Sequence, residues 1–292
     1  MPAFGLTAFS TDESADPGQI AAATETAGFH LLLFPDHTHV PVARRTPYPG
    51  GGEMPAHYRR THDPLVASAW AVSASRHLRV GIGVCLVPAR DPIVLAKQVA
   101  SLDVMSGGRF VLGVGAGWNA EEIADHGVDP GSRWAVMRER VLAMRAIWAD
   151  DEAQFHGEHV SFGPLWSWPK PVQRPGPPIM VGGHGDGVID RVVEYGDEWL
   201  VMPSPGRPPL RERIRLLHER AEAAGRARPA VSCQLYGEVR PELVDKLVDS
   251  GVERIDLSVP HAPPEQMVEA IGRLGETIAP FARAARRTNG AT

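Results

Sequence analysis

The chain has 292 residues, of which 43% are hydrophobic and 22% charged, and its formal net charge is −5. Because acidic and basic residues are mixed along the chain, this composition excludes a basic surface for nucleic acid and a polybasic membrane patch. No secretory signal is visible, and no apolar run approaches the ~18 residues of a membrane span. Cys85 and Cys233 both lie inside apolar runs, where a disulfide framework is not expected. We therefore expect a protein of the reducing cytoplasm.

Short apolar runs alternate with longer amphipathic segments along the whole chain. The runs that predict strands are 4–9, 30–34, 78–87, 109–115, 177–183, 197–203, 230–237 and 254–260. Several of them are almost continuously apolar, which is typical of strands that are buried on both faces of a parallel sheet.

A helix is predicted after each strand. Three helices begin at the pairs Asp16-Pro17, Asp63-Pro64 and Asp91-Pro92, because aspartate is a good N-cap and proline is tolerated in the first turn. The other predicted helices cover 132–148, 186–195, 208–224, 241–250 and 264–285. Eight such strand–helix units favour a closed (β/α)8 TIM barrel that forms a single domain over residues 1–292.

Three connections are too long to be simple turns. Segments 36–62 and 116–131 follow the second and fourth strands, so they belong to the carboxyl-terminal face of a barrel. Segment 150–177 precedes the fifth strand and starts with a hairpin-like sequence, in which Phe155 and Phe162 flank HGEHVS. Long loops in compact domains are usually functional, so we expect the first two segments to select the substrate.

The sequence FPDHTHV places Asp36, His37 and His39 at the end of the second strand. A His-x-His pair at a strand end is typical of metal-dependent hydrolase barrels, but these carry the pair after the first strand and need further ligands after later strands. Here the strand end EWLVMPSPG has no histidine, and Asp256 stands near the start of the last strand. We therefore expect no metal, which leaves a redox site or a polar loop as interpretations.

Two glycine-rich strand ends are further candidates. The sequence VGGHGD, residues 181–186, precedes a helix and suits a phosphate group, although a tight turn also explains its glycines. The sequence GAGWN, residues 115–119, suits a flat ring lying against the backbone, and a flexible strand exit is the alternative. Cys85 is interpreted as a packing residue.

From about residue 30 to residue 200 the chain resembles the luciferase-like monooxygenase superfamily, and within it the coenzyme F420-dependent oxidoreductases. The stretches that carry the resemblance are FPDHTHV (34–40), the run from VGIGV to GWNAEE (80–122), QFHGEHVSF (154–162) and PVQRPGPPIMVGGHGD (171–186). The pattern LAKQ…LDxxSxGRFxLGVGxGW is specific to the superfamily but says less about which flavin is bound.

The resemblance implies a TIM barrel that holds the coenzyme ring at the carboxyl ends of its strands. It implies that Asp36 and His37 lie beside the reactive carbon of the ring, and that the strand at Val84-Cys85 carries a non-proline cis bulge. The residues that it implies for contact with the coenzyme are Val84, Cys85, Gly115, Ala116, Gly117 and Trp118 around the ring, and Gly182, Gly183 and His184 near the phosphate.

Trp118 departs from the pattern of some members of this group. Some F420-dependent dehydrogenases have a glutamate at this position, directly after the Gly-x-Gly of the fourth strand, where it acts as an acid. Glu121 and Glu122 lie a turn further along the chain, and we do not expect them to reach the site. His37, oriented by Asp36 or a nearby group, is therefore expected to move the proton, because histidine titrates near neutral pH.

The expected function is that of an F420-dependent oxidoreductase, which transfers a hydride between the deazaflavin coenzyme and a small organic substrate. Two alternatives remain open: an FMN-dependent monooxygenase that uses reduced flavin and O2, and a non-catalytic barrel that binds a flavin or deazaflavin. The expected partners are the small-molecule substrate, an F420 or flavin reductase, and a second copy of the chain in a homodimer.

Overall fold

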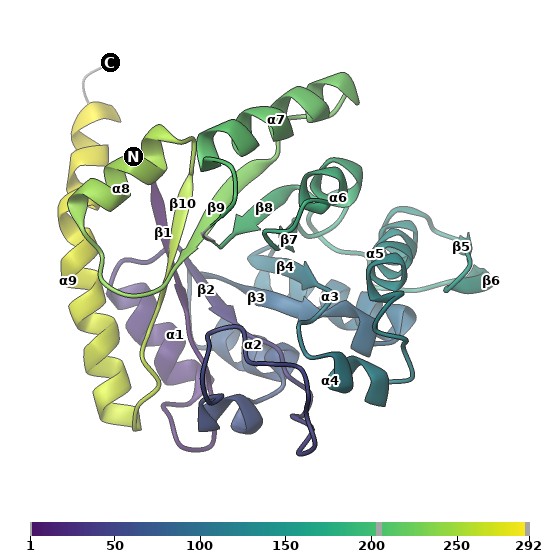
Figure 1. Ribbon diagram of the computed structural model, residues 1–292, viewed down its shortest axis with the longest axis horizontal. Coiled ribbons are helices and arrows are strands. Elements are labelled where there is room, and N and C mark those ends of the chain that lie inside the picture. Colours follow the sequence, from purple (N-terminus) through teal and green to yellow (C-terminus); the bar gives the residue numbers. More distant parts are fainter. Residues whose placement is uncertain (1, 203–205, 290–292) are drawn as a thin grey trace.

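Eight parallel strands close into a barrel in which β1 pairs with β10, as predicted (Figure 1). The computed structural model describes residues 2–202 and 206–289. Around the barrel the strands follow the order β1, β10, β9, β8, β7, β4, β3, β2. Their bounds are β1 Ala3–Thr7, β2 Leu31–Phe34, β3 Arg79–Leu86, β4 Phe110–Gly115, β7 Ile179–Gly182, β8 Glu198–Val201, β9 Ala230–Leu235 and β10 Arg254–Ser258.

The observed strands are slightly shorter than the predicted apolar runs, because the last residues of several runs turn away to form the carboxyl-terminal face. The strand predicted at 197–203 is observed at Glu198–Val201. Its predicted last residue, 203, lies outside the described residues, as do residues 1, 204–205 and 290–292 of the predicted domain.

Helices follow the barrel strands and surround the barrel (Figure 1). Their bounds are α1 Pro17–Thr26, α2 Pro64–Ser73, α3 Pro92–Ser106, α4 Ala120–Asp125, α5 Arg133–Ala149, α6 Val188–Tyr195, α7 Leu210–Ala223, α8 Pro241–Asp249 and α9 Pro264–Asn289. Asp16, Asp63 and Asp91 accept hydrogen bonds of 2.9 to 3.1 Å from backbone N–H groups in the first turns of α1, α2 and α3. The three predicted Asp-Pro helix starts are thus confirmed.

The long connections contain more structure than the sequence indicates. Segment 36–62 includes a short 3-10 helix at Ala56–Arg60, and segment 116–131 includes α4, which was not predicted. The predicted hairpin is confirmed as β5 Ala153–His156 and β6 Ser161–Leu165, and it lies away from the barrel beside α5 (Figure 1).

The apolar stripe of α5 packs against the barrel and not against solvent. Met137, Val141, Met144 and Trp148 are buried, and the indole N–H of Trp148 donates to the carbonyl of Ala96 on α3 at 3.0 Å. The stripe therefore belongs to the core. None of the helices in the described part of the chain has the length and apolar character needed to cross a bilayer.

A cluster of three buried charges fills the barrel near the amino ends of its strands. Arg254, at the start of β10, pairs with Asp256 at 2.8 Å and with Glu198 of β8 at 2.7 Å. Gly5 of β1 leaves room for this cluster, because a Cβ atom there would lie 2.0 Å from a carboxylate oxygen of Asp256. Burial raises the pKa of Asp256, and the charge of Arg254 opposes this effect.

Candidate active site

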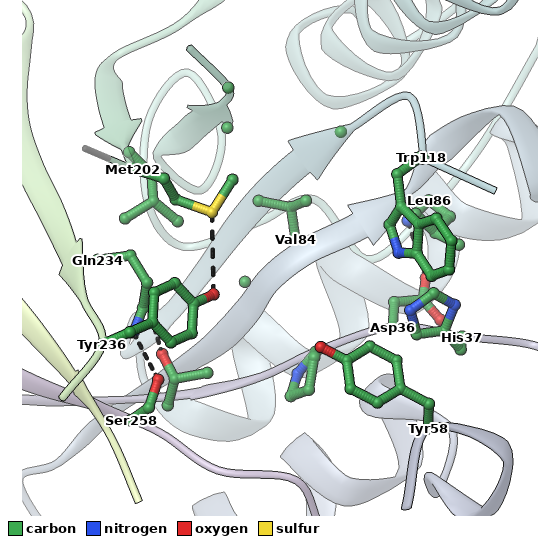
Figure 2. A pocket seen from close by; sticks show the side chains of 18 of the residues that line it. Asp36, His37, Tyr58, Val84, Leu86, Trp118, Met202, Gln234, Tyr236 and Ser258 are labelled. Atoms are coloured by element: carbon green, nitrogen blue, oxygen red, sulfur yellow. Dashed lines mark hydrogen bonds between the residues drawn. The ribbon is translucent and has the colours of Figure 1, made fainter. Parts of the chain in front are cut away.

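A cavity of about 580 Å³ opens at the carboxyl ends of the barrel strands (Figure 2). All eight strands contribute residues at or just after their ends, namely Thr7, Asp36, Val84, Gly115, Gly182, Leu200, Gln234 and Ser258. This volume is in the range of coenzyme and small-ligand sites, and this face is where TIM barrels carry their active sites.

His37 lies in the wall of the cavity directly after β2 and is 8% exposed. Its Nδ1 atom is 2.8 Å from Oε2 of Glu122, which is 1% exposed. The other carboxylate oxygen of Glu122 accepts a hydrogen bond from the backbone N–H of Thr38 at 3.0 Å. The expectation that Glu122 is too far along the chain is wrong, because α4 turns its side chain back toward the end of β2. Asn119 followed by Ala-Glu-Glu was the sequence signal for this short helix.

Asp36 lines the cavity, but its hydrogen bonds go to β3 and not to His37. The guanidinium of Arg90 donates to both carboxylate oxygens at 2.8 and 3.1 Å, and the backbone N–H of Leu86 donates at 2.9 Å. Asp36 therefore ties the end of β2 to the end of β3. Of the two groups considered for orienting His37, a nearby residue does so, and Asp36 does not.

Val84 forms the centre of the cavity floor (Figure 2). The peptide bond between Gly83 and Val84 is cis, and the pairing of β3 with β4 shifts register here. The expected non-proline cis bulge is thus confirmed, one residue before the expected position at Val84-Cys85. A Cβ atom on Gly115 or Gly182 would lie 2.5 or 2.7 Å from a methyl group of Val84. The two glycines therefore make space for this side chain.

Cys85 points away from the cavity into the core, so the implied contact with the coenzyme is wrong. The interpretation of Cys85 as a packing residue is confirmed. Side chains alternate along a strand, and the bulge gives the cavity-facing position to Val84. Burial raises the pKa of the Cys85 thiol, which keeps it protonated and unreactive.

Trp118 and two tyrosines form an aromatic wall around His37. Gly117 and Ala116 lead from β4 into this wall, and the ring centroids of Trp118 and His37 are 5.8 Å apart. Tyr58 lies 5.3 Å from His37, and its hydroxyl is 3.1 Å from that of Tyr48. Sequence reasoning missed both tyrosines, because segment 36–62 has no periodic pattern that would fix their positions.

The glycine-rich segment at 182–185 also lines the cavity, together with the first turns of α6. Gly183 has a φ of +141°, a conformation that favours glycine. The Nδ1 atom of His184 is buried and has no hydrogen-bond partner among the described residues. Arg191 of α6, which sequence reasoning missed, also lines the cavity and stacks on Trp134 with its guanidinium 3.8 Å from the ring centroid.

The histidines at the end of β2 do not share one site. His39 lies outside the cavity lining, where its Nε2 atom is 3.0 Å from Oδ2 of Asp125. Within residues 2–202 and 206–289 no group of three or more histidine, cysteine or acidic side chains is arranged to hold a metal ion.

The fold and the cavity together define a TIM-barrel enzyme with a coenzyme-sized site. Residues 8–244 match the sequence profile of the luciferase-like monooxygenases, and the chain belongs to this family. The superfamily resemblance is thereby confirmed. Members of the family are oxidoreductases and monooxygenases that depend on F420 or on a flavin, and this protein is an enzyme of that class.

Two relatives illustrate the range of the family. An uncharacterised protein of Mycobacterium tuberculosis is 36% identical over 280 residues, which are 94% of this chain and 98% of that protein. The FMNH2-dependent dimethylsulfone monooxygenase of Pseudomonas putida is 28% identical over 169 residues, which are 57% of this chain and 46% of that protein.

Two solved structures share the fold along nearly their whole length. Monooxygenase RslO1 from Streptomyces bottropensis has a TM-score of 0.75 at 19% identity, covering 96% of this chain and 99% of that one. An F420-dependent secondary alcohol dehydrogenase, solved with an F420-acetone adduct, has a TM-score of 0.74 at 17% identity, covering 94% and 98%. At these identities the likeness shows the fold alone.

Proposed function

We propose that this protein is an F420-dependent oxidoreductase in which His37 moves the proton that accompanies hydride transfer to or from a small organic substrate. The observation that carries the proposal is the buried pair of His37 and Glu122 in the cavity wall. Transfer of a hydride between a coenzyme and a substrate oxygen function also requires a proton in each turnover. A buried imidazole held by a carboxylate suits this role.

The residues of the cavity fit a deazaflavin coenzyme. Val84 and the backbone at Gly115 provide a floor for a flat ring, and the segment Gly182–Gly185 leads into the amino end of α6. The cation of Arg191 and the unpaired Nδ1 atom of His184 suit an anionic group near that helix end. When bound, the coenzyme would accept or supply the hydride, and the protein would supply position and exclude water.

Glu122 determines which nitrogen of His37 is available. An ionised carboxylate only accepts hydrogen bonds, so it accepts one from the Nδ1–H group of His37. The Nε2 atom is then free to take up or release a proton. The second hydrogen bond of Glu122, from the backbone of Thr38, fixes the carboxylate against the loop that carries His37.

An FMN-dependent monooxygenase that uses O2 is the second candidate, and the Pseudomonas relative supports it. Such an enzyme would depend on a partner reductase for reduced flavin. The buried pair of His37 and Glu122 is compatible with both candidates, so the coenzyme that binds decides between them. A barrel that only binds the coenzyme is a third candidate, and it gives no role to a buried acid behind His37.

The deciding experiment titrates the purified protein with F420 and, separately, with FMN, following the fluorescence of each coenzyme. We expect F420 to bind with a dissociation constant in the ~1 μM to 1 mM range that is usual for enzyme ligands, and FMN to bind at least ~10-fold more weakly. Binding of FMN without F420 would support the monooxygenase and overturn the proposal.

Substitution of His37 separates binding from proton transfer. We expect His37→Ala to bind F420 but to lose about 100-fold or more in turnover of F420, measured by its absorbance. His39→Ala is the matched control, because His39 lies outside the cavity. Equal turnover by the two variants would contradict the role of His37.

A further inference from the structure

The part of the cavity between His37 and Tyr236, called the aromatic half below, is lined by aromatic rings that come from separate parts of the chain. Phe9 follows β1, Tyr58 belongs to segment 36–62, Trp118 follows β4 and Tyr236 follows β9. Figure 2 shows Tyr58, Trp118 and His37 on one side of the cavity and Tyr236 on the other, with Val84 between them. An apolar space with aromatic sides therefore lies next to the proton-moving group.

The rings on the His37 side support one another. The centroids of Tyr48 and Tyr58 are 5.2 Å apart, those of Tyr48 and Trp118 are 6.0 Å apart, and those of Phe9 and Tyr58 are 4.7 Å apart. Such contacts hold the rings in place before any ligand binds. A flat ligand would find a preformed surface there.

Two titratable side chains that line this half beside His37 are neutral. The Tyr58 hydroxyl reaches the Tyr48 hydroxyl at 3.1 Å, and burial followed by this hydrogen bond raises the pKa of Tyr58, so the group stays protonated. The ring of His57 stacks on that of His261 at 4.8 Å, and burial lowers the pKa of His57 to about 4. Both groups are therefore uncharged near neutral pH.

Charged side chains that line or border the cavity are already paired or stacked. Asp36 is paired with Arg90, and the guanidinium of Arg191 stacks on Trp134 beside the glycine-rich segment. The guanidinium of Arg44 lies 5.6 Å from the ring of Trp118, but Arg44 is not part of the cavity lining. Among the described lining residues, the aromatic half thus offers no guanidinium or ammonium group to an anion, which would lose its hydration without compensation.

We propose that the substrate is a neutral aromatic molecule with one hydroxyl or carbonyl oxygen, which binds beside Tyr58 and Trp118 with that oxygen directed to Tyr58 and His37, while the coenzyme ring occupies the floor at Val84. The proposal names the substrate class of the site and rests on the proposed oxidoreductase function. The rings bind the apolar body, the Tyr58 hydroxyl hydrogen-bonds the oxygen, and no guanidinium or ammonium group among these rings compensates a carboxylate for its lost hydration.

The test measures binding of small probes by calorimetry, with and without F420. The probes are acetophenone (neutral, with a carbonyl), ethylbenzene (the same ring without oxygen) and benzoate (an anion). We expect acetophenone to bind at least ~10-fold more tightly than benzoate and several-fold more tightly than ethylbenzene, since a neutral hydrogen bond contributes ~1 kcal/mol. Equal or tighter binding of benzoate, or no binding of acetophenone, would overturn the proposal.

Substitution of the hydroxyl tests the assigned contact. In Tyr58→Phe, acetophenone should no longer bind more tightly than ethylbenzene, while the affinity for ethylbenzene should stay the same. Tyr195→Phe is the control, because Tyr195 is buried on α6 outside the cavity, and its variant should keep the advantage. If Tyr58→Phe still bound acetophenone more tightly than ethylbenzene by the original factor, the contact with the Tyr58 hydroxyl would be refuted. If this variant fails to fold, Tyr48→Phe should reduce the same advantage by misplacing Tyr58.

The two proposals fail in different ways. If the probes show the expected preference but F420 does not bind, only the proposed coenzyme is wrong. If F420 binds and the probes show no preference for neutral aromatic molecules, only the substrate class is wrong.

Discussion

The carboxylate of Glu122 supports His37 from a position behind the cavity wall. The pair joins α4 to the end of β2 across 85 residues of chain, and both side chains are buried. Loss of one partner would leave the other buried group without its hydrogen bond, which is costly. We therefore expect Glu122 to act as a positioning residue for His37.

Glu122→Gln should lower kcat about 100-fold while the KM for substrate and the dissociation constant of F420 stay within a few-fold. The amide removes the charge that stabilises a protonated His37 and leaves the shape of the side chain intact. Glu121→Gln makes the same chemical change one residue earlier, where the carboxylate binds backbone N–H groups of Arg45 and Thr46 instead. Steady-state kinetics on both variants should show a loss in the first alone.

His57 should make the protein less stable in mild acid. Its pKa is about 4 in the folded state because of burial and then His261, and 6.5 is the ordinary value. The unfolded chain therefore binds the proton more tightly, so stability falls as pH drops below about 6.5 and the loss is complete near pH 4. With allowance for partial exposure, His57 accounts for about 1 kcal/mol.

Urea unfolding at pH 7 and pH 4.5 checks this expectation. His57→Gln should lose less stability between the two pH values than the unmodified protein does. His159→Gln, at an exposed position in the hairpin connection, should not change the difference. A pH dependence that is the same in all three proteins would contradict the assignment to His57.

The site residues that could be predicted from the sequence are those whose position follows from a strand end. Asp36, His37, Gly115 and Gly182 stand at or just after the ends of apolar runs, and all line the cavity, whereas Val84 was implied only by the family resemblance. The contact between Glu122 and His37 could not be predicted, because it depends on the direction in which α4 leaves β4. Periodicity in a sequence carries no information about such an angle between elements.

At the scale of elements, the junction of β3, β4 and β7 forms the cavity floor. Val84 occupies the space that Gly115 and Gly182 leave open. Gly115→Ala should destabilise the protein by about 1–3 kcal/mol and weaken F420 binding, because the new methyl group would displace Val84. Gly163→Ala, on the hairpin strand β6 where a Cβ atom meets nothing within 4 Å, should have almost no effect.

A double-mutant cycle tests whether the clash is with Val84 itself. Val84→Ala makes room for the methyl group, so the combined variant should recover most of the stability lost in Gly115→Ala. The free energies of unfolding from urea titrations give the coupling. If the two effects simply add, the packing of Val84 between the glycines is not the cause.

The regular elements were well predicted because their signals are local. A continuously apolar run marks a buried strand, and the side chain of Asp91 caps α3 whatever the rest of the chain does. The bulge at Val84 was predicted only within one residue, because a register shift depends on the pairing with β4 and not on the run itself.

At the scale of the whole molecule, the two ends of the barrel have different functions. The charge cluster of Arg254, Asp256 and Glu198 lies at the amino ends of the strands, and the cavity lies at their carboxyl ends. This division is usual for TIM barrels, where one face governs stability and the other governs activity. The expected homodimer stays a prediction.

Arg254→Met should therefore reduce stability without changing coenzyme binding. It leaves two buried carboxylates without their partner, at a cost of about 3–5 kcal/mol. Urea unfolding should show this loss, while the dissociation constant of F420, measured on the folded fraction, should stay within a few-fold of its original value. A large change in F420 affinity would mean that the two ends are coupled.

The pairing of β1 with β10 has a consequence for how the protein is made. Thr7 and Ser258 are register partners in this pairing, and both line the cavity. On the ribosome, β1 emerges first. Its edge opposite β2 has no partner until β10 has been synthesised. A nascent chain that ends before β10 has open edges on β1 and β9, which other chains can join. The coenzyme therefore cannot help the growing chain to fold, because its complete site exists only after the last strand has closed the barrel.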